Sequence, residues 1–106
     1  MHGIQEPMYF IYIIYSKSSD IYYVGYSGDV NQRLKQHNEL AEGTFTSKHR
    51  PWILKAVFSC GDRAVTMRAE KFIKKQKSKS FIEALINGVS LTGILSHLVR
   101  VPHARD

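Results

Sequence analysis

The chain has 106 residues, 43% of them hydrophobic and 23% charged, which is the composition of a single globular domain and argues against a disordered chain. Its formal net charge is +6, with 15 Lys and Arg against 9 Asp and Glu, which favours a polyanionic partner. Cys60 is the only cysteine, which excludes an intrachain disulfide and a cysteine-based zinc site, and the longest apolar run, residues 8–15, is too short to cross a bilayer.

Residues 8–15 are β-branched or aromatic and are apolar on both alternating faces, so they predict a central strand. The turn-forming residues 16–20 and a second apolar strand over 21–26 follow, and the two strands predict a hairpin.

Register decides which side chains this hairpin presents. A turn with an even number of residues that pairs Tyr15 with Asp20 places Tyr12 opposite Tyr23 on one face, whereas a one-residue slip sends the two hydroxyls to opposite faces. Gly25 shares a face with Tyr23 and leaves room beside it for another backbone or a ligand. Ordinary packing of aromatic strands explains any single tyrosine equally well.

Asp29 predicts the N-cap of a first helix, whose apolar stripe is Val30, Leu34 and Ala41. Arg33 and His37 are four residues apart on its sheet-facing side, so both side chains can point at one spot. A core histidine bonded to a carbonyl or a tyrosine hydroxyl, and an arginine that extends along the sheet margin, explain the pair equally well.

The remaining elements are a polar loop over 42–50, a third strand over 52–60, a helix capped by Asp62, and a short helix capped by Ser78 or Ser80 that ends at 87–88. Apolar spacing over 91–99 predicts one more amphipathic helix, which would cover the sheet or dock a partner. We therefore expect an α/β protein of the α+β kind, with a three-stranded antiparallel sheet flanked by helices in the order β-β-α-β-α-α and an extra C-terminal helix.

The excess positive charge lies in residues 48–79, which hold ten basic and two acidic groups and so carry a net charge of +8. Such a concentrated basic stretch favours nucleic acid first and an acidic membrane surface second, although a solvated lysine-rich helix has the same composition. Glu70 is the only carboxylate between Arg63 and Ser80. We expect Glu70 either to form an ion pair with Lys74 or to bind a hard cation such as Mg²⁺, together with water and a substrate phosphate.

Five segments of the chain resemble the GIY-YIG endonucleases, in order and at the family's spacing. They are Phe10-Ile11-Tyr12, Tyr23-Val24-Gly25, the Arg33-Leu-Lys-Gln-His37 helix segment, the Thr-containing loop 45–52 and the helix segment 68–75 that carries Glu70. The likeness covers roughly residues 8–87 and is closest to the small single-domain bacterial branch. Phe10 and Val24 depart from the motif, but both tyrosines are present.

The resemblance implies a metal-dependent DNA endonuclease of low sequence specificity, selective for DNA structure and acting in DNA repair or recombination. The catalytic residues would be Tyr12, Tyr23, Arg33, His37 and Glu70. Glu70 would hold one Mg²⁺ or Mn²⁺ ion, and Arg33 would neutralise charge on the phosphoryl oxygens. Tyr12, helped by His37 and with a pKa lowered by Arg33 and the metal, or else His37 itself, would be the general base, and Tyr23 would bond to water or phosphate.

The expected partner is DNA, branched or single-stranded, and the side chains expected to contact its phosphates are Lys48, Arg50, Lys74, Lys75 and Lys77. The alternative is a non-catalytic nucleic-acid-binding module that retains the fold. We expect residues 8–87 to form the nuclease-like domain, 1–7 an N-terminal extension, and 88–106 an amphipathic helix or tail packed on or near it.

No Lys or Arg precedes the apolar run and no small-residue cleavage site follows it, so we expect a cytoplasmic protein without membrane contact. No small-molecule cofactor is expected, the oligomeric state is left open, and metal binding should be weak without DNA because Glu70 is surrounded by lysines.

Overall fold

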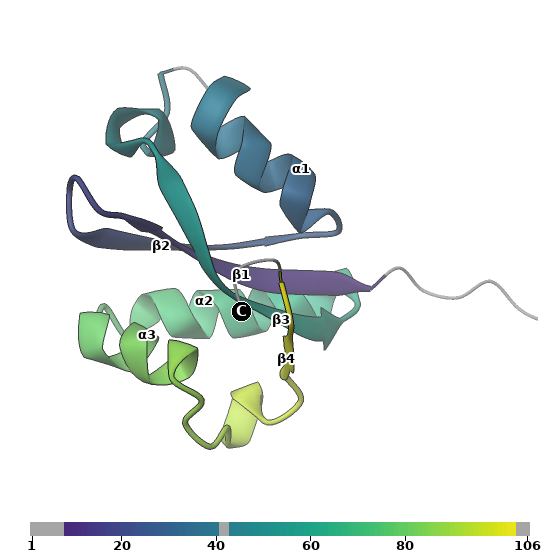
Figure 1. The fold of residues 1–106 in the computed structure, drawn as a ribbon. Coiled ribbons are helices and arrows are strands. Elements are labelled where there is room, and N and C mark those ends of the chain that lie inside the picture. Colours follow the sequence, from purple (N-terminus) through teal and green to yellow (C-terminus); the bar gives the residue numbers. More distant parts are fainter. Residues whose placement is uncertain (1–7, 41–42, 104–106) are drawn as a thin grey trace, which may run out of the picture.

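The centre of the molecule is an antiparallel sheet with strand order β2-β1-β3-β4, in a computed structural model that describes residues 8–40 and 43–103 (Figure 1). The strands are β1 (Tyr9–Ser16), β2 (Ile21–Ser27), β3 (Trp52–Gly61) and β4 (Val99–Val101). The helices are α1 (Val30–Lys35), α2 (Arg63–Lys75) and α3 (Lys79–Ile86), with a π-helical turn η1 (Gln36–Leu40) and two short 3₁₀ helices, η2 (Thr46–His49) and η3 (Gly93–Leu95).

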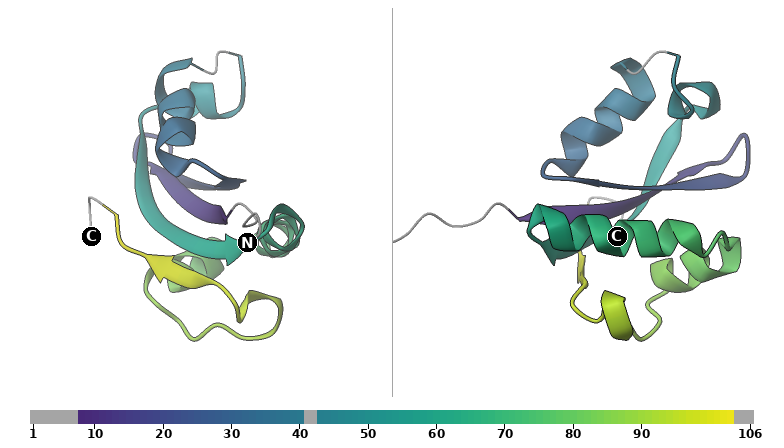
Figure 2. Two further views of the ribbon diagram at one scale, coloured as in Figure 1. Left: turned by 90° about the vertical axis from the view of Figure 1, so that its right-hand side faces the viewer. Right: turned by 180° about the vertical axis from the view of Figure 1, so that it is seen from behind.

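Helix α1 covers one face of the sheet, and α2 and α3 cover the other (Figures 1 and 2). Strand β1 is central, as predicted, and its side chains alternate between two apolar clusters. Ile11 and Ile13 pack with the α2 and α3 side, whereas Tyr12 and Ile14 pack on the α1 side. The α+β class is therefore confirmed. Among the described residues no helix is both long and apolar enough to cross a membrane.

The hairpin keeps the predicted face of each tyrosine but shifts their pairing by two residues. Ser16 pairs with Ile21, so the turn has four residues and Tyr12 lies opposite Gly25, while Tyr23 lies opposite Ile14. The predicted pairing of Tyr12 with Tyr23 is therefore wrong. Because the shift is even, both tyrosines still point to the α1 face.

Gly25 leaves room for the ring of Tyr12, which fills the space that the sequence assigned to another backbone or a ligand. A Cβ atom at position 25 would lie 2.5 Å from Tyr12 Cζ, which is far inside van der Waals contact. The glycine of the second motif is thus required by the tyrosine of the first.

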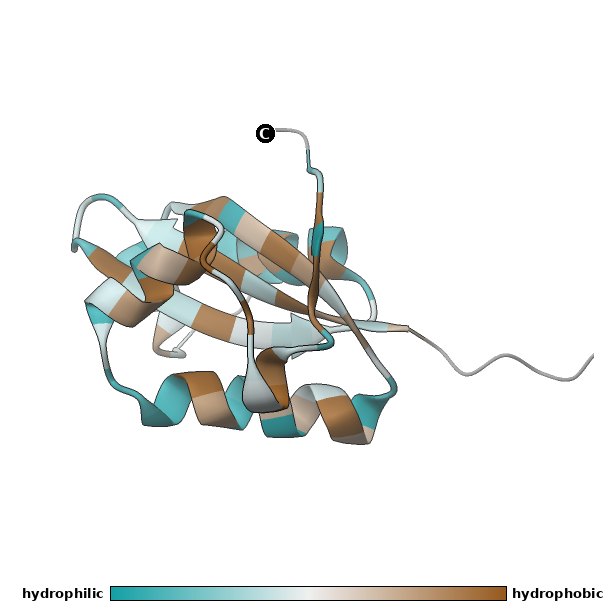
Figure 3. Ribbon diagram, turned by 90° about the horizontal axis from the view of Figure 1, so that it is seen from below, coloured by the Kyte–Doolittle hydropathy of each residue, from teal (hydrophilic) through white to brown (hydrophobic). Residues whose placement is uncertain are grey.

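All three predicted helix N-caps are confirmed. The side chains of Asp29, Asp62 and Ser78 accept hydrogen bonds from the backbone N–H three residues further on. Helix α2 turns Ala69 and Ile73 toward the sheet, and its alternating apolar and polar residues are visible in Figure 3. The polar loop over 42–50 contains η2, and Ala41 of the predicted stripe lies outside the described residues, as do residues 1–7.

The expectations of a three-stranded sheet and a C-terminal helix are wrong. Residues 93–95 form only one 3₁₀ turn, and β4 then pairs with the free edge of β3. Gly93 has a φ of +62°, which interrupts an α-helix, and the β-branched Val99 and Val101 favour a strand. Leu95 and Leu98 are buried in the cluster beneath α2 and α3, so this part of the tail covers the protein's own core.

The contact between Gly25 and Tyr12 predicts that Gly25→Ala lowers the free energy of unfolding by about 1–3 kcal/mol, because the added methyl group displaces a buried ring. Gly28→Ala is the matched control, since a Cβ there comes no closer than 3.8 Å to Tyr9. Urea denaturation of both variants measures the difference. Equal stability of the two variants would contradict the assignment.

Candidate active site

Tyr12 and His37 form a buried hydrogen-bonded pair between β1 and the turn after α1. The Tyr12 hydroxyl oxygen lies 2.7 Å from His37 Nε2, and the two side chains are 1% and 7% exposed. Because Gly25 has no side chain, the Tyr12 ring lies over β2 and its hydroxyl faces α1. Both residues were predicted from the sequence as site residues, and the structure brings them into contact.

The π-helical turn η1 carries His37 and is fastened by contacts that sequence reasoning missed. His37 Nδ1 lies 2.9 Å from Thr46 Oγ1, so both ring nitrogens have partners. Asn38 donates to the carbonyl of Trp52 and accepts from its N–H, and Arg50 Nε donates to the carbonyl of His37 at 2.6 Å. These contacts join segments far apart in sequence, so no local periodicity signals them.

Tyr23 and Arg33 line a cavity of about 220 Å³ together with His37, Phe45 and Thr46. The Tyr23 ring packs edge-on against His37 at a centroid distance of 5.3 Å. Arg33 is exposed rather than turned into the sheet, so its guanidinium reaches this cavity from the surface of α1. Three of the five predicted catalytic side chains, Tyr23, Arg33 and His37, therefore line one cavity, and the buried Tyr12 contacts it through His37.

Glu70, the fifth, belongs to α2 on the other face of the sheet and is connected to the cavity through Lys74. Lys74 Nζ lies 3.3 Å from Glu70 Oε2 and 4.8 Å from the centroid of the Tyr23 ring. Strand β2 is at the edge of the sheet, so Lys74 links the two faces around that edge.

Glu70 is the group best suited to hold a divalent cation. No set of three His, Cys, Asp or Glu side chains that could enclose a metal occurs within the described residues. The Glu70 side chain is 16% exposed and forms an ion pair with Lys74. This donor set fits Mg²⁺ or Mn²⁺, which bind through one carboxylate together with water and a substrate phosphate.

Burial keeps both members of the Tyr12–His37 pair neutral. Desolvation raises the pKa of Tyr12 far above its usual value, and the charges of Tyr23 and Glu70 act in the same direction. Desolvation, with Arg33 and Arg50 nearby, lowers the pKa of His37 to about 4. The protein's own side chains therefore do not lower the pKa of Tyr12, because burial outweighs the attraction of Arg33.

The predicted phosphate-contacting side chains differ in what they touch. Lys48, Lys75 and Lys77 are exposed, whereas Lys74 pairs with Glu70. The Arg50 guanidinium donates hydrogen bonds to the carbonyls of Gln36 and His37, so it stabilises the turn η1.

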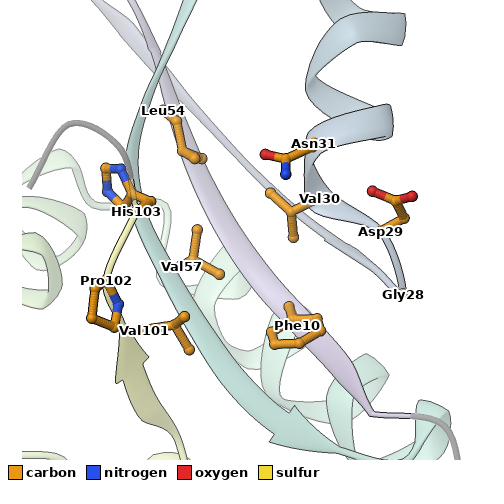
Figure 4. A pocket seen from close by; sticks show the side chains of 10 residues that line it. All are labelled: Phe10, Gly28, Asp29, Val30, Asn31, Leu54, Val57, Val101, Pro102 and His103. Carbon is orange, nitrogen blue, oxygen red and sulfur yellow. The ribbon is translucent and has the colours of Figure 1, made fainter.

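A larger cavity, of about 380 Å³, lies at the opposite end of α1 and contains none of the predicted catalytic residues (Figure 4). Val30 and Asn31 of α1, Val57 of β3 and His103 of the tail all face it. The smaller cavity, in contrast, is lined by three of them, Tyr23, Arg33 and His37.

The smaller cavity lies in a small α+β domain and is lined by Tyr23, Arg33 and His37, three of the side chains that the resemblance predicts. The family model described as the GIY-YIG catalytic domain matches residues 8–83, and the chain belongs to this family. It is similar to the UPF0213 protein YazA of Bacillus subtilis (strain 168), with 31% identity over 71% of this chain and 78% of the relative. It is also similar to the UPF0213 protein in ldhD 5'region of Pediococcus acidilactici, with 29% identity over 92% of this chain and the whole of the relative.

The lowered pKa of His37 makes stability depend on pH. His37 binds its proton near pH 4 in the folded state but near 6.5 when unfolded, so the unfolded chain binds more protons between these values. We expect the free energy of unfolding to be highest above pH 6.5 and to fall by roughly 1–3 kcal/mol toward pH 4. The lowered pKa of Asp20 acts only below its ordinary 3.8.

Urea denaturation between pH 4 and 7.5, with the ring signals of His37 followed by NMR, measures this effect. His37→Gln should remove most of the slope. A His37 titration midpoint near 6.5 in the folded protein would contradict the assignment.

Proposed function

We propose that this protein is a divalent-metal-dependent DNA endonuclease of low sequence specificity, selective for DNA structure and acting in DNA repair or recombination. The observation that carries the proposal is the 2.7 Å contact between the buried Tyr12 hydroxyl and His37, which lines the same cavity as Arg33. Membership of the GIY-YIG family supports the same reading.

The neutral pair suits a proton relay to which both candidate bases contribute. His37 is unprotonated at pH 7, and the relay uses the tautomer in which Nε2 accepts the Tyr12 hydroxyl proton while Nδ1–H donates to Thr46 Oγ1. In the proposed reaction, the Tyr12 oxygen takes a proton from the attacking water as its own proton passes to His37. A free tyrosinate, which burial disfavours, is then never formed.

Substrate charge makes this relay favourable. Arg33 and Arg50 oppose protonation of His37 in the free protein, so a transfer without substrate is uphill. A phosphodiester beside Arg33 adds negative charge near His37 and raises its pKa, while Arg33 stabilises the phosphoryl oxygens. The base is therefore activated by the molecule it acts on.

Glu70 would hold the metal ion, which when bound supplies Lewis-acid polarisation of the phosphate and stabilisation of the leaving oxygen. Arg68 and Lys71 line a cavity of about 260 Å³ together with Glu70, so cationic side chains flank the carboxylate on α2. They would position the phosphate backbone without reading bases, which is the origin of the low sequence specificity.

The proposal predicts that the protein nicks supercoiled or branched DNA with Mg²⁺ or Mn²⁺, and that Glu70→Ala and Arg33→Ala each lower the rate by at least about 100-fold, because each removes charge stabilisation at the phosphate. Glu39→Ala, an exposed carboxylate on η1, is the matched control. DNA affinity should also fall steeply as salt is added. Salt-dependent binding without nicking by the wild type would instead favour the non-catalytic binding module.

The relay predicts that Tyr12→Phe lowers the nicking rate by about 100-fold or more, because the attacking water loses its proton acceptor. Tyr15→Phe is the matched control, since it removes another β1 hydroxyl, one that donates to the exposed Asp20. Thermal melting of both variants separates chemistry from folding. Full activity of a folded Tyr12→Phe protein would leave His37 as the direct base.

A further inference from the structure

Phe45 is a large apolar side chain that remains 54% exposed at the rim of the candidate active site. It precedes η2 and lines the same cavity as Tyr23, Arg33 and His37. The proton relay does not use it, and it belongs to neither apolar cluster of the sheet. An exposed aromatic ring at the rim of a polar cavity is suited to bind a ligand that has a flat apolar face.

Contacts on two sides hold the ring in place. The Tyr23 ring stacks with it at a centroid distance of 6.3 Å and an interplanar angle of 30°, and His49 packs against it at 4.7 Å. The next residue, Thr46, is buried and bonded to His37. Phe45 is therefore adjacent in sequence to the first residue of the hydrogen-bond chain Thr46–His37–Tyr12. This chain fixes the position of the Phe45 backbone relative to His37 and Tyr12 before a ligand binds.

The charges around Phe45 narrow the choice of ligand. Arg33 lines the same cavity, Lys48 is exposed on η2, and Lys74 lies over the Tyr23 ring. An aromatic ring next to several cations fits a nucleotide, since the cations attract its phosphate and the ring stacks on its base. Every base has such a face, so this contact also requires no particular sequence.

We propose that Phe45 is a stacking platform for an unpaired base of the bound DNA strand, next to the phosphate at Arg33. This inference rests on the proposed function and names its substrate class. A base within a continuous duplex is covered on both faces by its neighbours, whereas a single strand, a flap or a mismatch offers a free face. Phe45 thus favours DNA with an unpaired nucleotide at the bound phosphate.

The test measures binding without metal, so that cleavage is not needed. The probes are a short single-stranded oligonucleotide with 2-aminopurine at its centre and a fully paired hairpin duplex that carries the same label. Stacking quenches 2-aminopurine, and we expect the wild type to quench only the single-stranded probe. Phe45→Ala should remove the quenching and lower single-strand affinity by about 5- to 150-fold, with less than about a two-fold change for the duplex.

Phe45→Trp should restore both quenching and affinity, because it restores an aromatic face. Phe72→Ala, which removes a 37% exposed ring from α2, is the matched control and should leave both unchanged. Equal losses for single strand and duplex, or quenching that persists in Phe45→Ala, would overturn the platform. If the platform is overturned but the wild type still nicks DNA with metal, the nuclease proposal stands. If quenching depends on Phe45 but the wild type does not nick DNA, the platform stands and the nuclease proposal fails.

Discussion

The site depends on the ring of Tyr12 lying over Gly25. Strand β2 can pass beneath this ring only where it has no side chain, and the ring must lie there for its hydroxyl to meet His37 at 2.7 Å. The contact also selects the register of the hairpin. Pairing two residues away would set Tyr12 against Tyr23, two large rings on one face, and would remove the hydroxyl from its partner.

The same burial determines the charge of the resting site. Desolvation raises the pKa of Tyr12 and lowers that of His37, so both groups are neutral although the charges of Arg33, Arg50 and Glu70 act on them. Opposite shifts on two hydrogen-bonded groups oppose proton transfer until an outside charge arrives. In the proposed relay, the buried pair would therefore transfer a proton only when substrate is bound.

Local signals predicted the elements well, since strand alternation, turn residues and helix caps depend on neighbours in sequence. Asp29, Asp62 and Ser78 cap helices for that reason. The features that sequence reasoning missed are non-local. Strand β4 forms because β3 has a free edge, and Thr46 bonds His37 because η2 folds back over η1. The raised pKa of Tyr12 depends on burial by several segments at once, which no motif encodes.

Lys74 explains how a site divided between two faces of a sheet can act as one. It pairs with the carboxylate of Glu70 on the α2 side and covers the ring of Tyr23 on the α1 side. While it does so, it screens the carboxylate from free cations, which is consistent with weak metal binding in the absence of DNA. In the proposed reaction, a phosphate in the cavity would offer Lys74 a second anion and weaken its ion pair with Glu70. Substrate binding at Arg33 and exposure of the carboxylate would then be coupled through one ammonium group.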